Sequence, residues 1–217
     1  SDLKDYEFLD PSNLDKEIHE GDVQTKILLT FDDGFFSNRV LAEEILSKYG
    51  IKAIFFITED FIGLQDEEIN PFVQKHFYLS SSTPPKDKVL SKPMSWIDIN
   101  WLKENWHKIG AHTKTHPKLS KLKDEDTLIE EIITSANRIE ENTGVKINCF
   151  AFPFGTLHSI NKQVVEIAKT RFDFIFSNLR GSVIESPGSQ FIFRQNIIPS
   201  DPQWLTRMVI EGKLDWL

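Results

Sequence analysis

Two adjacent carboxylates, Asp32 and Asp33, end an apolar run of strand length that spans residues 27–31. Gly34 follows them, and short apolar runs that stop at a glycine are typical of buried strands. Because an unpaired carboxylate is costly to bury, two of them at such a strand end need compensation, which a bound metal ion supplies. The alternative is a turn or a helix N-cap, where Asp-Gly pairs are common but one aspartate suffices. This stretch alone leaves both interpretations open.

Two histidines, His112 and His116, stand four residues apart in the sequence. On one helical turn this spacing puts both imidazoles on the same face, where they can bind one ion. The pair is a weak signal by itself. Together with a carboxylate from another strand end, it becomes a two-histidine, one-carboxylate set, which suits a catalytic zinc ion or a non-haem iron.

The chemistry-bearing residues follow strands in a regular alternation of strands and helices. Residues 26–31, 40–49 and 51–58 are expected to form a strand, a helix and a strand, and such a βαβ unit implies parallel pairing. The alternation continues with expected strands at 108–111, 147–152, 172–177 and 191–198, and expected helices at 96–106, 124–143, 161–170 and 201–211. This pattern predicts an α/β fold, either a barrel or an open sheet, with its site at the carboxyl ends of the strands.

Two regions depart from the alternation. Residues 1–25 are polar and mixed in charge, and we expect an N-terminal arm with one short helix, which leaves residues 26–217 as a single domain. Residues 64–95 contain several prolines and a run of serines, and we expect a long loop insertion with a short helix near 71–77. Loops of that length in compact domains are usually functional or mobile, and a lid over the site is one interpretation.

Composition limits the class of protein. The chain has 217 residues, of which 40% are hydrophobic and 27% are charged, as in ordinary globular domains. A net charge of −8 argues against a nucleic-acid surface, and no apolar run reaches the roughly 18 residues of a membrane span. The single cysteine, Cys149, excludes an internal disulfide. No signal-peptide pattern opens the chain, so a cytoplasmic location is expected, and the oligomeric state is left open.

The motifs at the strand ends resemble those of a known family. Residues 30–34 (TFDDG), followed by residues 112–117 (HTKTHP), resemble the first two motifs of the polysaccharide deacetylase (NodB homology) family. Residues 50–57 are similar to its second strand, and residues 150–155 (FAFPFG) are similar to a variant form of its third motif that some branches carry. The resemblance covers roughly residues 26–198. It implies a distorted (β/α) barrel of about seven strands and a metal-dependent hydrolysis of an N-acyl group on an amino sugar.

The resemblance also implies a division of roles among the residues. Asp33, His112 and His116 would hold a divalent metal, most simply Zn²⁺, and Asp32 would be the general base. The chemistry agrees, because a bound ion activates water and an unligated carboxylate is free to take its proton. In the family a backbone N–H of the third motif stabilises the oxyanion, and this points to Phe154.

Two departures from the family pattern concern the catalytic machinery. The more usual third motif has an arginine, which orients the base, where this chain has Ala151. Arg194 on the last expected strand could orient the base from another direction, or it could be a surface arginine. The family's final motif supplies a histidine as general acid, but no histidine follows His158 in this chain. His158 could serve as that acid, or it could be a solvated loop histidine.

Three functions follow from these expectations. The first is a deacylase that removes an acetyl or formyl group from a polymer or from a nucleotide- or lipid-linked amino sugar. The second is a catalytically weak or inactive carbohydrate-binding member of the fold, which the missing histidine and Ala151 favour and the presence of Asp32 disfavours. The third is a hydrolase of cyclic amides or purine derivatives. The sequence specifies neither the sugar nor the native metal.

Overall fold

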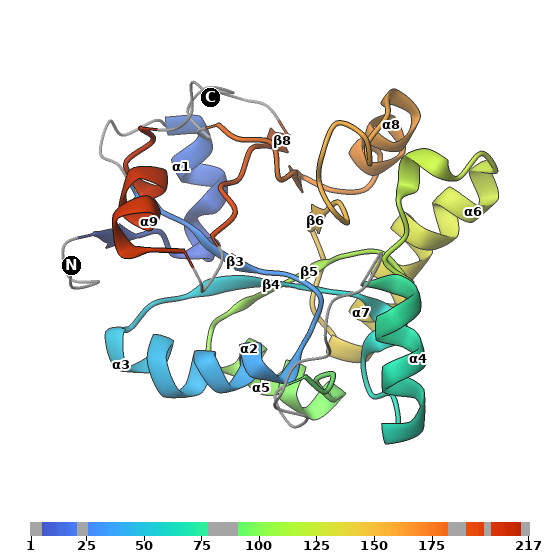
Figure 1. Ribbon diagram of the computed structural model, residues 1–217, viewed down its shortest axis with the longest axis horizontal. Coiled ribbons are helices and arrows are strands. Elements are labelled where there is room, and N and C mark those ends of the chain that lie inside the picture. Colours follow the sequence, from blue (N-terminus) through green and yellow to red (C-terminus); the bar gives the residue numbers. More distant parts are fainter. Residues whose placement is uncertain (1–5, 21–25, 78–90, 182–189, 198–200, 214–217) are drawn as a thin grey trace.

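The computed structural model describes residues 6–20, 26–77, 91–181, 190–197 and 201–213. A six-stranded sheet forms the centre of the protein, and each strand pairs in parallel with the next strand in chain order (Figure 1). The strands are β3 (Leu29–Phe31), β4 (Ala53–Ile57), β5 (Lys108–Ala111), β6 (Cys149–Ala151), β7 (Phe174–Phe176) and β8 (Phe191–Ile192). Parallel strands that follow one another in space in the same order as in the chain are typical of a (β/α) barrel. Here the sheet curls into half a barrel. The expected α/β barrel fold is confirmed.

The strand count and some strand ends differ from expectation. About seven strands were expected. The described residues form a six-stranded sheet and a separate parallel pair of β1 (Glu7–Phe8) and β2 (Lys26–Ile27). The strand expected at residues 26–31 is divided at Leu28, because β2 pairs with β1 and only β3 pairs with β4. The last expected strand, 191–198, is only two residues long as β8, and residue 198 lies outside the described part.

The helices follow the strands as the sequence predicts. They are α1 (Leu14–Glu20), α2 (Phe36–Leu41), α3 (Ser47–Tyr49), α4 (Asp66–His76), α5 (Trp96–Glu104), α6 (Glu125–Ile129), α7 (Ser135–Thr143), α8 (Lys162–Lys169) and α9 (Gln203–Ile210). Two π-helical segments, Ala42–Leu46 and Glu130–Thr134, join α2 to α3 and α6 to α7. Ser95 caps α5 by accepting a hydrogen bond from the Asp98 N–H, and Asn161 caps α8 in the same way.

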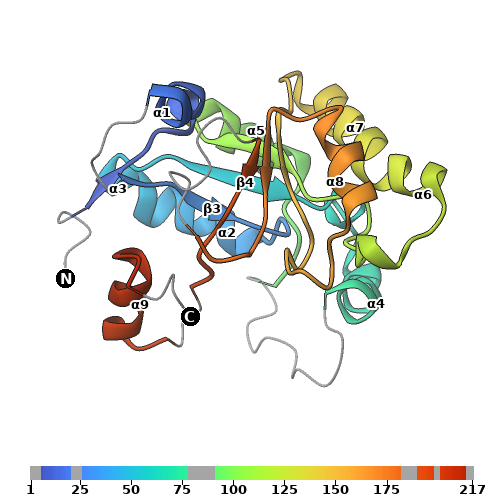
Figure 2. The same ribbon diagram turned by 90° about the horizontal axis from the view of Figure 1, so that it is seen from above.

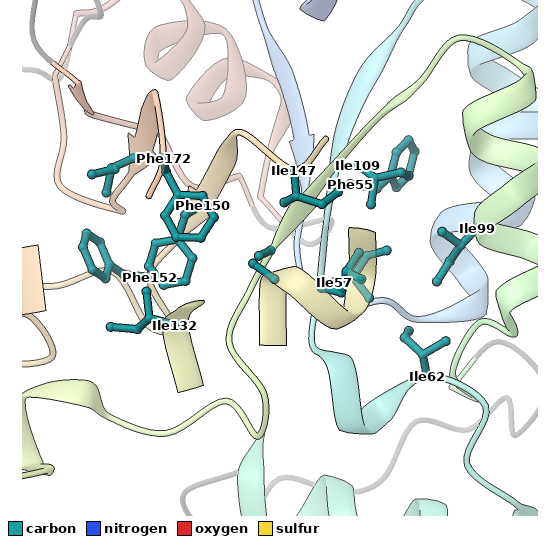
Figure 3. Packing of buried hydrophobic residues seen from close by; sticks show 14 of the residues in the cluster. Phe55, Ile57, Ile62, Ile99, Ile109, Ile132, Ile147, Phe150, Phe152 and Phe172 are labelled. Atoms are coloured by element: carbon teal, nitrogen blue, oxygen red, sulfur yellow. The ribbon is translucent and has the colours of Figure 1, made fainter. Parts of the chain in front are cut away.

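Apolar side chains cover both faces of the sheet. One face packs under the helices and forms the main core, of which Figure 3 shows Phe55, Ile57, Ile109 and Phe150 from three neighbouring strands. Alternate strand residues form a second cluster on the other face, and Leu14 of α1 is buried in it. The region expected to be an arm, residues 1–25, therefore contributes to the core, although residues 1–5 and 21–25 lie outside the described part.

The region expected to be a loop insertion, residues 64–95, contains a longer helix than the sequence suggested. Helix α4 begins at Asp66 and includes Pro71 in its interior. The Glu68 carboxylate accepts a hydrogen bond from the Gln65 N–H at 3.0 Å, and Ile69 and Val73 are buried against Phe61. The cap and this burial offset the helix-breaking effect of proline. Residues 78–90 of the expected loop lie outside the described part.

The register of the sheet brings the motif residues to one edge. Phe31 pairs with Phe55, and Ile57 pairs with Ala111. The residues that follow β3 and β5 therefore leave the sheet at the same edge, where the turn after β6 also lies (Figures 1 and 2). Within the described residues, no helix is long and apolar enough to cross a membrane.

A candidate metal site at the carboxyl ends of the strands

A tight turn after β3 presents Asp32 and Asp33 side by side. Asp33 has a φ of 77° and Gly34 a φ of 98°, and the Gly34 N–H donates to the Asp32 carbonyl at 3.0 Å. A residue with a side chain would be strained at the φ of Gly34, and its Cβ would also come within 2.8 Å of the terminal methyl group of Ile62, so this turn favours glycine. The Asn38 side chain also donates to the Asp32 carbonyl at 3.0 Å. These hydrogen bonds hold the backbone of the turn without any contribution from the two carboxylates.

The two histidines lie in a turn of irregular backbone, not on a helical turn. Thr113 and His116 have φ values of 69° and 62°, and the His116 N–H donates to the Thr113 hydroxyl at 2.9 Å. Spacing alone suggested a shared helical face, and this interpretation was wrong. The left-handed residues bend the chain so sharply that the rings still meet, with centroids 5.0 Å apart.

Each histidine ring is oriented by a backbone carbonyl. His112 Nδ1 lies 2.8 Å from the Ala151 carbonyl oxygen, and His116 Nδ1 lies 3.1 Å from the His76 carbonyl oxygen. Because a carbonyl can only accept, each Nδ1 carries the proton and each neutral ring presents its Nε2 lone pair. The two Nε2 atoms lie 3.5 Å and 3.4 Å from Asp33 Oδ1.

This geometry fits a divalent cation. One ligand atom from each of Asp33, His112 and His116 lies within 4.8 Å of the others. Ligands about 2.1 Å from a tetrahedral zinc ion are about 3.4 Å from one another, close to the two separations from Asp33 Oδ1. Carbonyl partners on the remote ring nitrogens are also the usual support of metal-bound histidines. The residues present therefore suit such an ion.

Asp32 has a different partner from Asp33. The Arg194 guanidinium binds both of its carboxylate oxygens, with Nη1–Oδ1 at 2.7 Å and Nη2–Oδ2 at 2.8 Å. Arg194 also donates to the Thr30 hydroxyl and to the Ser177 carbonyl. Burial by itself would raise the pKa of Asp32, but Arg194 outweighs it and lowers the pKa to about 2. Arg194 follows β8, so this ion pair spans the opening between the two edge strands of the sheet.

The two carboxylates also set the charge of the histidines. Burial disfavours the charged form of His112, but the nearby Asp32 and Asp33 outweigh burial and raise its pKa. Burial and the neighbouring His112 lower the pKa of His116 to about 4. With both rings neutral, two carboxylates and one guanidinium leave a net charge of −1 in a largely buried site. That charge favours a bound cation.

Comparison with known families identifies the chain. A family model described as polysaccharide deacetylase matches residues 19–171, well over half of the sequence. The chain belongs to the polysaccharide deacetylase family. A curated relative, the uncharacterized protein YlxY of Bacillus subtilis, is 32% identical over 101 residues, which are 42% of this chain and 30% of that protein. The match therefore spans less than a third of the relative's length.

Solved structures share the fold of this deacetylase family member. A Streptococcus pyogenes deacetylase, PplD, solved in complex with acetate, is 18% identical, with 97% of this chain and 79% of that chain covered and a TM-score of 0.70. A de-N-acetylase from Aggregatibacter actinomycetemcomitans is 16% identical, with 95% and 85% covered and a TM-score of 0.70. At these identities the likeness establishes a common fold.

The turn after β6, which carries the expected third deacetylase motif, also reaches the site. Phe154 has a φ of 61°, and its ring packs against His116 with centroids 4.8 Å apart. Gly155 is required next to it, because a Cβ there would collide with the backbone nitrogen of Asn178. The Asn178 side chain donates to the Phe154 carbonyl at 3.2 Å, which fixes the orientation of this peptide unit. The role of the Phe154 N–H in binding an oxyanion stays a prediction.

His158 is not brought to the metal cluster. Its side chain is exposed. Its backbone carbonyl accepts a hydrogen bond from the Ser120 hydroxyl at 2.7 Å. Among the described residues, its ring has no hydrogen bond or ion pair with Asp32, His112 or His116. Its role as a general acid stays a prediction.

Two residues that support the histidine turn were not singled out in the sequence. The backbone carbonyl of His76 orients His116, and a backbone atom leaves no residue-type signal. Glu131 is buried and binds the turn between the two histidines. A signal for Glu131 was available, since it lies three residues after buried Leu128 and four before buried Ser135, on the apolar stripe of its helix.

Proposed function

We propose that this chain is a metal-dependent deacylase, which hydrolyses the N-acyl group of an amino sugar, free or within a glycan. The observation that carries the proposal is the convergence of Asp33, His112 and His116 next to a second carboxylate, Asp32, that is held by Arg194. A ligand set beside a separately anchored carboxylate is what metal-assisted hydrolysis needs. Membership of the polysaccharide deacetylase family supports the choice of substrate class.

Asp33, His112 and His116 would hold the ion. When bound, a divalent cation, most simply zinc, lowers the pKa of a water molecule and polarises the acyl carbonyl. The Ala151 and His76 carbonyls keep both imidazole rings in the tautomer that this binding requires. The proposal includes an acetyl or a formyl group as the acyl group that is transferred to water.

Asp32 would accept the proton of the attacking water. Its low pKa keeps it ionised at neutral pH, and the two-point contact with Arg194 fixes the orientation of its carboxylate. Arg194 would thus replace the arginine that the family usually carries at the position of Ala151. This replacement is consistent with the variant third motif at residues 152–155 (FPFG) and with a separate branch of the family.

The oxygen that gains negative charge would be bound by the Phe154 N–H. Asn178 supports this residue by donating to the Phe154 carbonyl, which lies in the next peptide unit. The departing amine must also receive a proton. His158, exposed on the loop after β6, is the proposed acid. If His158 does not act, a weak deacylase or a carbohydrate-binding protein of the same fold is the second candidate function.

Metal content and amine release test the proposal together. Purified wild type and His116→Ala are dialysed against zinc, and bound zinc is measured by atomic emission. We expect about one ion per chain in the wild type and little in the variant. Release of primary amines from acetylated and formylated amino sugars and oligosaccharides, with and without a chelator, then tests the activity. The absence of zinc from both proteins would contradict the metal site, and zinc binding without amine release would favour the carbohydrate-binding function.

A further inference from the structure

The turn that carries the two histidines points two successive backbone N–H groups at one carboxylate oxygen. The Lys114 N–H and the Thr115 N–H lie 3.0 Å and 2.9 Å from Glu131 Oε2. The Thr115 hydroxyl donates to the other oxygen, Oε1, at 2.6 Å. Successive N–H groups next to a left-handed residue, here Thr113, form a concave cradle that favours an anion. Glu131 fills this cradle with a charge from the protein itself.

The helix that contains Glu131 is adapted to this contact. Glu131 lies in the π-helical segment Glu130–Thr134, and the Ser135 N–H donates to the Glu130 carbonyl, five residues back. The Glu131 carbonyl accepts instead from the Lys114 N–H at 3.1 Å and from the Ser135 hydroxyl at 2.6 Å. Single turns of π-helix are frequent at functional sites. The helix thus contacts the turn through both the side chain and the backbone of one residue.

The burial of Glu131 makes this contact hard to replace. Only 7% of the residue is exposed, so water cannot readily take over the hydrogen bonds of its carboxylate. The neighbouring Glu130 differs, because its partly exposed carboxylate binds the side chains of Lys114 and Arg138 and no backbone group of the turn. Substitutions of Glu130 and Glu131 can therefore be compared: both remove a negative charge near the turn, but only the Glu131 substitution removes hydrogen bonds to the backbone of the turn.

From these contacts we propose that Glu131 is a positioning residue for the metal site. It holds the backbone between His112 and His116 so that both rings face Asp33, and it acts through the turn without touching the ion. This inference rests on the proposed metal site, because the turn itself supplies two of the three ligands. Groups that orient metal ligands typically contribute about 10- to 100-fold to metal affinity. We expect a contribution of roughly this size from Glu131.

Zinc affinity in three variants tests the proposal. Competition with a coloured chelator should show zinc bound about 10- to 100-fold more weakly by Glu131→Ala than by the wild type. Glu131→Gln should recover most of this loss, because an amide oxygen still accepts from both N–H groups. Glu130→Ala is the matched control and should stay within about twofold of the wild type. The visible spectrum of the cobalt-loaded protein should change in Glu131→Ala and not in Glu130→Ala, since it reports ligand geometry.

A second measurement needs no metal. Amide hydrogen exchange of the metal-free protein should show Thr115 exchanging about tenfold or more faster in Glu131→Ala, with no change in Glu130→Ala. The Lys114 N–H should change less, because it keeps the backbone carbonyl of residue 131 as an acceptor. Equal zinc affinity and equal exchange in the wild type and Glu131→Ala would overturn the proposal. If Glu131→Ala does not fold, Thr115→Val removes the shortest contact, and unchanged affinity and exchange in that variant would likewise overturn it. A wild type that binds no zinc would refute the proposed function instead, and exchange would still decide whether Glu131 fixes the turn.

Discussion

His107 and His112 flank the same strand, β5, and both are buried, yet their surroundings shift their pKa values in opposite directions. At the carboxyl end of β5, Asp32 and Asp33 outweigh the burial of His112 and raise its pKa. At the amino end, burial, together with the positive charges of Lys52 and Arg39, lowers the pKa of His107 to about 4. At the carboxyl end of the sheet, negative charges favour a protonated imidazole. At the amino end, burial and positive charges keep the His107 imidazole neutral.

The two ends also differ in how their polar atoms are satisfied. His112 has a partner or a facing carboxylate for each ring nitrogen. His107 Nδ1 accepts from the Ala53 N–H at 3.2 Å, but its buried Nε2 has no hydrogen-bond partner in the part of the chain that the structure describes. The His107 ring packs against the apolar ring of Phe55, whereas His112 lies among carboxylates and a second imidazole. We expect substitutions at the two ends to separate activity from stability.

The largest expected effects come from the adjacent residues Asp32 and Asp33. Asp33→Asn should weaken zinc binding by more than about 100-fold, because it removes the anionic ligand while asparagine tolerates the positive φ at this position. Asp32→Asn should keep about one zinc per chain and lower kcat by about 100- to 10,000-fold, the usual contribution of a general base. Atomic emission and initial rates on one substrate measure both. Loss of zinc in Asp32→Asn would place Asp32 among the ligands and contradict the assigned roles.

A smaller effect is expected from Arg194→Lys. Lysine keeps the positive charge but cannot form the two-point contact that orients the Asp32 carboxylate, so kcat/KM should fall about 10- to 100-fold with zinc content unchanged. The matched control is Arg171→Lys at the amino end of β7, where Arg171 also binds a carboxylate, Glu140, and a backbone carbonyl. Its kcat/KM should stay within about twofold of the wild type. Equal losses in both variants would mean that Arg194 acts only through stability.

The sequence predicted the parts of this fold that depend on local pattern. The alternation of strands and helices follows from short-range periodicity and residue type. The convergence of Asp33 with the two histidines followed from the rule that parallel strands end at one edge. These features need only the order of the elements along the chain.

The remaining features depend on contacts between distant segments. The pairing of Arg194 with Asp32 was one of two interpretations of the sequence. It joins residues 162 positions apart and requires the sheet to curl until its edge strands approach, so local pattern could not choose between the two. Helix α4 was expected to be mostly loop because Pro71 breaks local helix propensity, whereas burial of Ile69 and Val73 stabilises the helix. The left-handed residue Thr113 was equally unexpected, since a β-branched residue rarely adopts a positive φ.

The smallest effect on activity, and a distinct effect on stability, is expected from His107→Asn. The asparagine oxygen can take the place of Nδ1 and accept from the Ala53 N–H, so the fold and the activity at pH 7 should be retained. In the wild type, the unfolded chain binds a proton at His107 below a pH of about 6.5, whereas the folded protein resists protonation until about pH 4. The free energy of unfolding should therefore fall as the pH falls through this window, by up to about 1.4 kcal/mol per pH unit for this one group. Urea unfolding at several pH values should show a shallower fall in His107→Asn, with exposed His158→Asn as the control; equal slopes in all three proteins would mean that His107 is protonated as readily in the folded protein as in the unfolded chain.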